Sequence, residues 1–291
     1  MLPCSTDHIY QLFGRGALPT LLYITKQEHG KRWIDRPMHS HKDIAEINVV
    51  FFGRGIYFNE LKRFLVGAGD VIVNNPRVPH ELSILPEQEN MGTYCLGLRG
   101  FQRPGLEENQ LIVPGEPVIR TGGHLHACLC ELCEILYRSI VHHDTDVPSA
   151  PMALAALLDM VLGLPPKPAA DAPGSLEETL AERVRRYIDA HFCEPLTLAG
   201  IAAELHCSAP YISHTFKNVT GFSPIQYATR CRIGLAQNYL ISSDYTATQI
   251  AQMVGYSNTN YFSTVFHQMV GQTPIQYRHN FLSGLRGSRT Q

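Results

Sequence analysis

The chain has 291 residues, of which 17% are charged and 44% hydrophobic, with a formal net charge of −2. This is an ordinary globular composition rather than a disordered one, and the length suits about two domains with separate cores. Residues 176–291 hold nine Lys/Arg against seven Asp/Glu, whereas residues 1–175 hold fifteen against nineteen. The small positive excess suits a polyanionic partner, but tight binding would need local placement of charge and dimerisation.

The sequence pattern indicates neither a signal peptide nor a membrane-spanning segment. The first 20 residues lack an apolar run flanked by positive charge, so we expect no signal peptide. Nowhere do eighteen apolar residues follow one another, so we expect no membrane span. Eight cysteines without a paired framework in a chain of this length indicate reduced thiols. We therefore expect a cytoplasmic protein.

Short strands dominate the pattern between residues 37 and 98. The stretch Gly53-Arg54-Gly55 is predicted to end the first long strand, and a polar turn at Asn59 forms a hairpin. Strands are expected at residues 44–52, 56–58, 64–66, 71–73 and 93–98. Many short strands separated by glycine and proline predict a sandwich or a small barrel, within an α+β protein.

Three histidines and a glutamate stand on these strands, as His39-x-His41-x4-Glu46 and, later, His80. His39 and His41 alternate onto one strand face, and imidazoles with a carboxylate suit a first-row divalent metal. The spacing is similar to the two cupin motifs, although the second lacks a glycine after Pro76 and is one residue short. Metal ligands, the polar rim of an effector pocket and structural histidines remain as alternatives.

Two apolar helices are predicted next, at residues 124–142 and 152–162. The first carries an apolar face at spacings of three and four, formed by Leu125, Leu129, Leu132, Leu136 and Ile140. It also carries Cys128, Cys130 and Cys133, each one turn from a histidine or cysteine. That spacing matches no standard zinc pattern, and cysteine is commonly a small core residue. Residues 163–175, rich in proline and alanine, are a linker.

The C-terminal part repeats itself. Residues 211–216, Gly221 and residues 224–227 recur fifty positions later, at 261–266, Gly271 and 274–277. Upstream, Ile201-Ala202 and Ser208 recur at an offset of 49 instead of 50. The second copy therefore has one extra residue just after these serines, and such an insertion is tolerated in a turn or at the start of a helix. Two copies are too few for a solenoid, so they predict two small helical units.

Each unit is predicted as two short helices joined by a tight turn. Thr197 and Ser208 cap the two helices of the first unit, and Gly221 ends the second of them. Thr246 and Gly271 mark the same places in the other unit. This is the helix-turn-helix plan, over residues 197–219 and 246–270, whose second helix enters the DNA major groove. A helix from Ser223 to about Leu240 connects the units.

The segment resembles the DNA-binding domain of the AraC/XylS family of transcription regulators. The matching residues are Ile201-Ala202, Ser208, Tyr211, Phe216-Lys217, Gly221, Pro224, Tyr227, Arg232, Ala236, Leu240, Ile250-Ala251, Gly255-Tyr256, Tyr261-Phe262, Phe266, Gly271, Pro274 and Tyr277-Arg278. The resemblance implies a cupin-like effector-sensing barrel (1–121), a helical dimerisation segment (122–162), the linker (163–175) and an all-α DNA-binding domain (176–291).

The resemblance also assigns residues to the sites. The groove-facing positions would be Pro210, Ser213, His214, Lys217, Thr259, Asn260, Ser263, Thr264 and His267. Of these, Asn260 can read adenine bidentately, whereas serine and threonine discriminate weakly. The aromatic residues expected in the core are Tyr211, Phe216, Tyr261, Phe262 and Phe266. The effector would meet His39, His41, Glu46 and His80.

We therefore expect a sequence-specific transcription regulator that responds to a small-molecule effector. Its expected partners are promoter DNA and a second copy of the chain through residues 124–162, with RNA polymerase as a further candidate. No catalytic residue, metal or cofactor is expected. The alternative is a metal-dependent cupin enzyme fused to a DNA-binding module, which the irregular second cupin motif disfavours.

Overall fold

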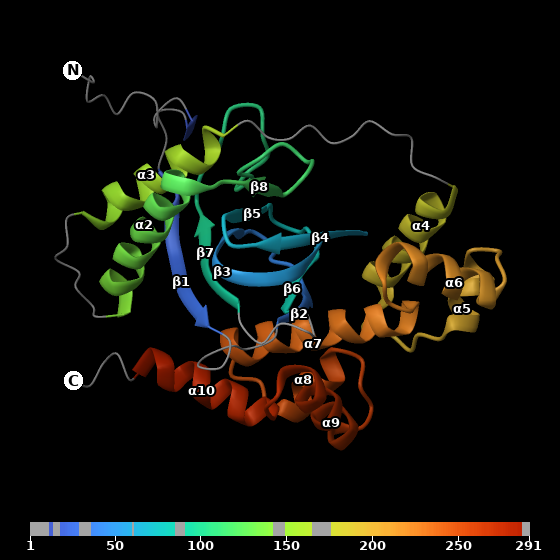
Figure 1. Ribbon diagram of the computed structural model, residues 1–291. Coiled ribbons are helices and arrows are strands. Elements are labelled where there is room, and N and C mark those ends of the chain that lie inside the picture. The colour runs from blue at the N-terminus through green and yellow to red at the C-terminus, as the bar shows by residue number, and fades with distance from the viewer. Residues whose placement is uncertain are drawn as a thin grey trace.

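The computed structural model describes residues 12–13, 18–28, 36–59, 61–84, 91–141, 149–164 and 176–286. It combines a sheet-rich half with a helical half, as Figure 1 shows. The strands are β1 (Thr20–Glu28), β2 (Arg36–His39), β3 (Ala45–Asn59), β4 (Lys62–Gly67), β5 (Asp70–Asn74), β6 (His80–Ile84), β7 (Met91–Arg99) and β8 (Val118–Arg120). The helices are α2 (Gly123–Val141), α3 (Ala150–Leu162), α4 (Leu176–His191), α5 (Leu198–Glu204), α6 (Ala209–Thr220), α7 (Pro224–Ser242), α8 (Ala247–Met253), α9 (Thr259–Val270) and α10 (Pro274–Arg286).

The strands form an antiparallel sheet organised around β3. The first half of β3 lies between β7 and β5, in the order β1-β7-β3-β5-β8, and its second half pairs with β4 and β6. β2 pairs with β6 at the other end. The α+β class and the sheet-rich domain predicted from the strand pattern are confirmed. Among the described strands the path stays open between β1 and β8 instead of closing into a barrel.

The long strand β3 differs from the prediction, because it runs through Gly53 and Gly55 without ending. Gly53 has a φ of 78°, next to a bulge between Val50 and Phe52, so the strand bends there and changes partners. Gly55 has no room for a side chain, since an added Cβ would lie 2.7 Å from the Ser83 carbonyl oxygen, which is backbone. The predicted hairpin is confirmed beyond this bend, where β3 pairs with β4. The strand β1 was not predicted.

Helices α2 and α3 cover the sheet on the side of β1 (Figure 1). The expected helix boundaries are confirmed to within two residues at their described ends. The apolar face of α2 is used mainly inside the chain, however, since Leu129 and Leu136 are fully buried against α3 and the sheet. Ile140, by contrast, is 40% exposed. The apolar face of α2 therefore belongs largely to the core of the sheet-rich half, and only part of it is exposed to solvent.

The helical half has the two predicted helix-turn-helix units. Thr197 accepts a hydrogen bond from the Gly200 amide at the start of α5, and Ser208 accepts one from the Tyr211 amide at the start of α6. Thr246 and Asn258 cap α8 and α9 in the same way. Both units end on a glycine in the left-handed region, with φ values of 83° at Gly221 and 78° at Gly271.

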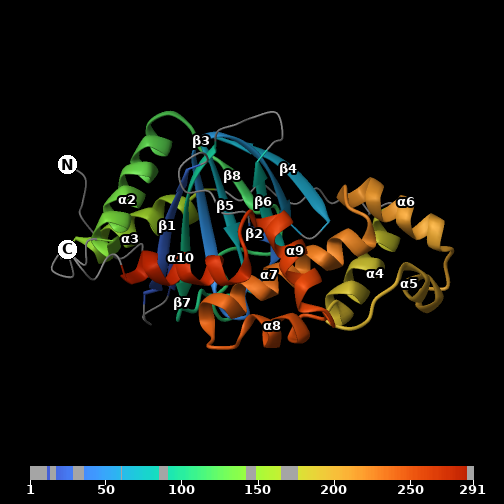
Figure 2. The same cartoon turned by 90° about the horizontal axis from the view of Figure 1, so that it is seen from below.

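The two halves touch along α7, which lies beneath β2 in Figure 1 and on the viewer's side of it in Figure 2. Met38 of β2 and Phe58 of β3 are buried in the same apolar cluster as Ile212 and Phe216 of the first helix-turn-helix unit. The expectation of a separate core on each side of the linker is therefore wrong for this unit. Most of the linker itself, residues 165–175, lies outside the described residues.

No described helix is long and apolar enough to span a lipid bilayer.

Candidate functional sites

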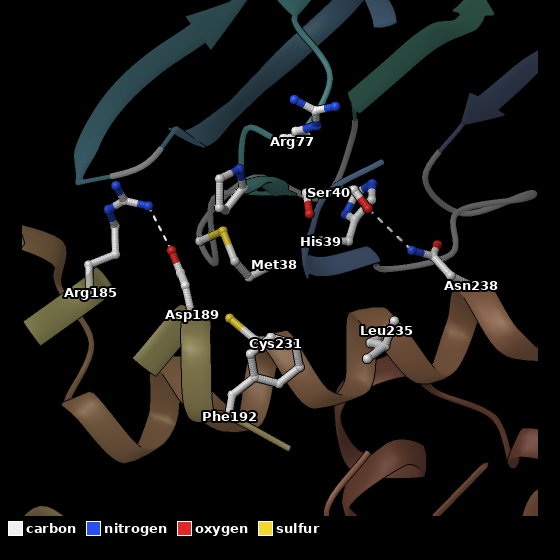
Figure 3. A pocket seen from close by; sticks show the side chains of 11 residues that line it. Met38, His39, Ser40, Arg77, Arg185, Asp189, Phe192, Cys231, Leu235 and Asn238 are labelled. Carbon is white, nitrogen blue, oxygen red and sulfur yellow. Dashed lines mark hydrogen bonds and ion pairs between the residues drawn. The ribbon is translucent and has the colours of Figure 1, made fainter. Parts of the chain in front are cut away.

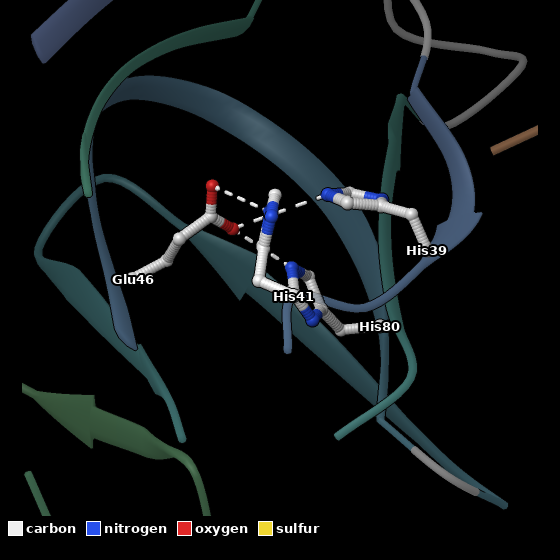
Figure 4. Close-up of side chains that lie close together, drawn as sticks. All are labelled: His39, His41, Glu46 and His80. Carbon is white, nitrogen blue, oxygen red and sulfur yellow. Dashed lines mark hydrogen bonds and ion pairs between the residues drawn. The ribbon is translucent and has the colours of Figure 1, made fainter. Parts of the chain in front are cut away.

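The predicted histidine and glutamate residues come together inside the sheet-rich half. His39 ends β2, His41 follows it, Glu46 is the second residue of β3, and His80 begins β6. The β2–β6 pairing places His39 directly opposite His80, so the short spacing after Pro76 does not keep His80 away. One ligand atom from each of the four residues lies within 4.8 Å of the others (Figure 4). All four predicted residues thus form one cluster.

Glu46 is the centre of this cluster. Its Oε2 lies 2.8 Å from His80 Nε2, and its Oε1 lies 3.3 Å from His41 Nε2. The Tyr23 hydroxyl donates a hydrogen bond to Oε1, and the Cys95 thiol lies 3.5 Å from the same oxygen. Burial alone would raise the pKa of Glu46, but the facing imidazoles hold it well below its ordinary range.

Backbone carbonyls fix the orientation of two of the rings. His39 Nδ1 lies 2.9 Å from the Pro37 carbonyl oxygen, and His80 Nδ1 lies 2.9 Å from that of Val78. A carbonyl only accepts, so each Nδ1 carries the hydrogen and each Nε2 points into the cluster. Burial and then the Arg36 guanidinium lower the pKa of His39 well below its ordinary value.

Sequence reasoning missed three residues that surround the cluster, namely Tyr23, Arg36 and Cys95. Arg36 Nη1 lies 3.9 Å from Glu46 Oε1, while its Nη2 donates to Asn238 of α7 at 3.1 Å. None of the three belongs to a motif, and Tyr23 stands on the unpredicted strand β1. The only available signal was their proximity to the motif after folding.

The cysteines of α2 do not join into a similar cluster. Cys128 lies 3.6 Å from His124, and Cys130 lies 3.5 Å from His126, each within its own helical turn. Burial raises the pKa of Cys133, which lies in the core, and of Cys130. Thiols held in the protonated form are poor metal ligands and poor nucleophiles. Within the described part of the chain, the histidine–glutamate cluster is the one group with three or more converging ligand atoms.

The predicted groove-facing residues lie on the outer surfaces of α6 and α9. Pro210, His214 and Lys217 are exposed on α6, and Ser213 is half-buried. On α9 the exposed residues are Asn260, Thr264 and His267, and the half-buried ones are Thr259 and Ser263. None of the nine is buried, and the Asn218 amide orients His214 through a hydrogen bond of 3.2 Å.

Two aromatic residues lie elsewhere than expected. Tyr211 is 49% exposed and Tyr261 is 62% exposed, whereas Phe216, Phe262 and Phe266 are buried as predicted. The reason is helical geometry: the residue one position further on, Ile212 or Phe262, already fills the inward position. Each unit therefore presents a tyrosine at equivalent places on its outer surface.

A second candidate site lies between the two halves. It is a cavity of about 370 Å³, shown in Figure 3, with walls from β2, α4 and α7. Its lining residues are Met38, His39, Ser40, Arg77, Pro79, Arg185, Asp189, Phe192, Cys231, Leu235 and Asn238. Arg185 is already paired with Glu182 and Asp189, at 2.7 Å each. His39 belongs both to this cavity and to the histidine–glutamate cluster.

Beside this cavity, a charged pair and an aromatic pair join the halves. Arg230 of α7 donates to the carboxylate of Glu81 in β6, which is only 2% exposed. The Phe58 ring of β3 packs against that of Phe222 at a tilt of 45°, with ring centroids 4.8 Å apart. The Arg230 guanidinium lies 4.3 Å from the Phe222 ring centroid. The contact between the halves is therefore buried and specific.

Comparisons with known proteins match both halves. A helix-turn-helix domain family matches residues 201–280, and the AraC-like ligand binding domain family matches residues 21–162, together about three quarters of the chain. An uncharacterized helix-turn-helix-type transcriptional regulator, YdiP of Escherichia coli (strain K12), is 27% identical over 96% of this chain and 92% of its own length.

Shorter or more distant matches accompany these. The bifunctional transcriptional activator/DNA repair enzyme AdaA of Bacillus subtilis (strain 168) is 37% identical over 33% of this chain, which spans only 45% of AdaA. The crystal structure of ToxT from Vibrio cholerae O395 is 13% identical, with a TM-score of 0.44, over 88% of this chain and 96% of that one.

Proposed function

The chain belongs to the AraC family of transcription regulators, and from that premise we propose that a ligand in the sheet-rich domain changes how two helix-turn-helix units hold promoter DNA. The transcription-regulator function follows from the family. The residues that carry it in this chain, the nature of the ligand and the path between the domains are our proposals.

The DNA contacts are proposed on the exposed surfaces of α6 and α9. The residues concerned are Pro210, Ser213, His214, Lys217, Thr259, Asn260, Ser263, Thr264 and His267. Asn260 would read an adenine edge, while Lys217 would contact a phosphate. The set holds no arginine, so we propose that specificity leans on DNA shape and on paired sites as well as on base edges.

The effector is proposed to bind at His39, His41, Glu46 and His80. The observation that supports this most strongly is that β2 contributes to the histidine–glutamate cluster and also packs against the DNA-binding domain. Its His39 belongs to the cluster, and its neighbours pack directly on α7, the helix between the two DNA-reading units. A change at the cluster that displaces β2 by a fraction of an ångström must also displace α7, because packed cores transmit strain.

Other parts of the proposal concern assembly and activity. We propose a homodimer through residues 124–162, where Ile135, Ile140 and Met152 remain exposed on α2 and α3. We further propose that the chain acts in the cytoplasm, contacts RNA polymerase and has no enzymatic activity. The name of YdiP, which is matched over nearly its whole length, supports a regulator rather than a metal-dependent enzyme fused to a DNA-binding module.

The DNA-reading proposal is tested with operator fragments selected by the purified protein. Asn260→Ala should cost about 1–3 kcal/mol and relax the preference at one base pair, because only one adenine edge loses its partner. Lys217→Ala should weaken binding evenly across sequences and reduce the salt slope by about one unit. Lys42→Ala, which removes an exposed lysine from the other domain, is the matched control.

A competition assay across point-mutated operators at two salt concentrations measures both effects. An unchanged base preference in Asn260→Ala would show that α9 does not read bases through this residue. If Lys42→Ala reduced the salt slope as much as Lys217→Ala, the proposed DNA-binding face would be wrong.

A further inference from the structure

One hairpin of the sheet-rich half reaches the first helix-turn-helix unit. Its strand β4 lies beside α6 (Figure 2), and Phe58, near the end of β3, is buried in the same apolar cluster as Phe216 of α6. In the register of the hairpin, Phe58 pairs with Arg63 of β4. The guanidinium carbon of Arg63 lies 5.7 Å from the centroid of the Phe58 ring. The hairpin therefore holds an arginine at the edge of the DNA-binding domain.

Arg63 meets α6 at the glycine that ends this helix. A Cβ built on Gly221 would lie 3.3 Å from Arg63 Nη1. The Gly221 amide donates to the Lys217 carbonyl, so Gly221 lies one turn beyond Lys217. The groove-facing positions 210, 214 and 217 are four and three residues apart, and position 221 comes four residues further. Such spacing places all four positions in one row along the helix surface. Arg63 therefore lies at the end of the groove-facing row of α6.

The second unit provides an internal comparison. Gly271 ends α9 as Gly221 ends α6, with a φ of 78° against 83°. In the described structure, however, a Cβ built on Gly271 would meet nothing within 4 Å. A helix of this unit therefore ends on its glycine without a neighbouring cation. The arginine beside Gly221 is an addition that the sheet-rich domain makes to the first unit alone.

Arg63 and its neighbour Lys62 have their charged groups available for a ligand. Both residues are exposed, and no carboxylate of a described residue forms an ion pair with either of them. Contact with the Phe58 ring holds the Arg63 guanidinium in place and leaves its N–H donors unused. Lys217 is the only lysine or arginine among the nine proposed groove-facing residues. Two more cations one turn beyond it would add substantially to the attraction for a polyanion.

A DNA phosphate is the anion that suits this position. Recognition helices contact base edges mainly through their N-terminal residues, so a group beyond the C-terminal end lies nearer to the sugar–phosphate strand. A guanidinium presents paired N–H donors that match phosphate oxygens, and an adjacent lysine adds a second positive charge.

We propose that Arg63, assisted by Lys62, binds a DNA phosphate beside the C-terminal end of α6. The DNA-binding surface of the regulator then includes part of its sheet-rich domain, outside residues 176–291. The inference rests on the proposed function, because it requires α6 to lie in the major groove. Arg63 keeps this position only while β4 stays against α6. A movement between the domains therefore changes the affinity for DNA without any change in α6 itself.

The test measures DNA binding by full-length Arg63→Ala between about 50 and 200 mM salt. Loss of one phosphate contact should reduce the slope of log K against log salt concentration by about 0.9. The weakening relative to wild type should therefore be about 3.5-fold greater at the lower salt concentration than at the higher one. It should also be equal for operator and non-specific DNA, because phosphates carry no sequence information. Arg54→Ala, which removes an exposed arginine from the other end of the hairpin, is the matched control and should keep the wild-type slope.

Two further variants separate a phosphate contact from a structural role of the Arg63 side chain. Arg63→Met keeps an apolar stem against Phe58 but no charge, so its salt slope should fall as in Arg63→Ala. Arg63→Lys keeps the charge, so it should restore most of the slope. If Arg63→Lys lost as much slope as Arg63→Met, packing of the guanidinium on Phe58 would explain the effect and the proposal would be wrong.

The remaining outcomes distinguish this inference from the proposed function. An unchanged salt slope in both Arg63→Ala and Arg63→Met would overturn the phosphate contact and leave DNA binding by the helical half standing. An equal reduction in Arg54→Ala would also overturn it, because any charge on the hairpin would then act alike. A wild-type protein that fails to bind DNA even at the lower salt concentration would overturn the proposed function, and this inference with it.

Discussion

Gly234 of α7 is the position where the contact between the two domains can be tested most directly. A Cβ added there would lie 2.2 Å from the Met38 carbonyl oxygen and 3.0 Å from the His39 Cβ. The first of these atoms is backbone, so no rotation of a side chain relieves the overlap. Gly234→Ala can be accommodated only if β2 and α7 move apart.

The magnitude follows from two opposing terms. Overpacking of a well-packed contact costs about 1–3 kcal/mol, and this cost applies only while the domains are docked. Alanine in place of glycine also favours the helix by about 1 kcal/mol, and this gain applies whether or not they are docked. The equilibrium between docked and separated domains should therefore shift about 5- to 150-fold toward separation, while α7 itself becomes no less stable.

The assay combines small-angle X-ray scattering of the full-length protein with DNA affinity by fluorescence anisotropy. Gly234→Ala should be more extended than wild type and should bind DNA with a different affinity, because the DNA-binding units are no longer held against β2. Gly122→Ala is the matched control, since an added Cβ there meets nothing within 4 Å. A Gly234→Ala protein that is as compact as wild type and binds DNA with the wild-type affinity would refute the coupling through β2 and α7.

Two further predictions concern charged contacts. Arg230→Met leaves the buried Glu81 carboxylate without its cation, so the free energy of unfolding should fall by about 3 kcal/mol in urea denaturation. Adding Glu81→Gln to this variant should restore most of the loss, and an equal loss in the double variant would contradict the pairing. Glu134, whose side chain is 27% exposed, has a pKa lowered to about 2 by the hydrogen bond from Tyr94 and then by that from Lys26. A depressed folded-state pKa stabilises the protein above the unfolded-state value near 4.5 and loses that stabilisation as pH falls toward 2. After screening by solvent, we expect the lowered pKa of Glu134 to contribute about 1 kcal/mol to the free energy of unfolding. Wild type should therefore lose stability between pH 5 and pH 3 more steeply than Glu134→Gln does. Parallel curves of stability against pH for the two proteins would refute this.

The sequence alone determined the helical half of the molecule. Helix caps such as Ser208 and ending glycines such as Gly221 act on amides within four residues, so their effect can be read without knowing the fold. The repeat at offsets of 49 and 50 then placed the two units, and the helix from Pro224 follows from its own capping box. The exposed Tyr211 and Tyr261 were misplaced because spacing alone cannot rank two adjacent apolar residues.

Tertiary structure decided everything that depends on residues distant along the chain. His80 joins His39 only because β2 pairs with β6. Tyr23 reaches Glu46 from β1, whose residues apart from Ile24 are not fully buried, so the strand shows no clear alternation of apolar and polar residues. The continuation of β3 through Gly53 depends on the partners that it gains beyond the bend.

The contact between the domains is the clearest case of this kind. Nothing local marks Gly234 or Met38, since a glycine within a helix and an apolar residue in a strand suit many surroundings. Their meaning comes from the close approach of α7 to β2, which joins two segments almost two hundred residues apart. Such a contact is set by the packing of whole elements, so it lies beyond the reach of periodicity, capping and spacing.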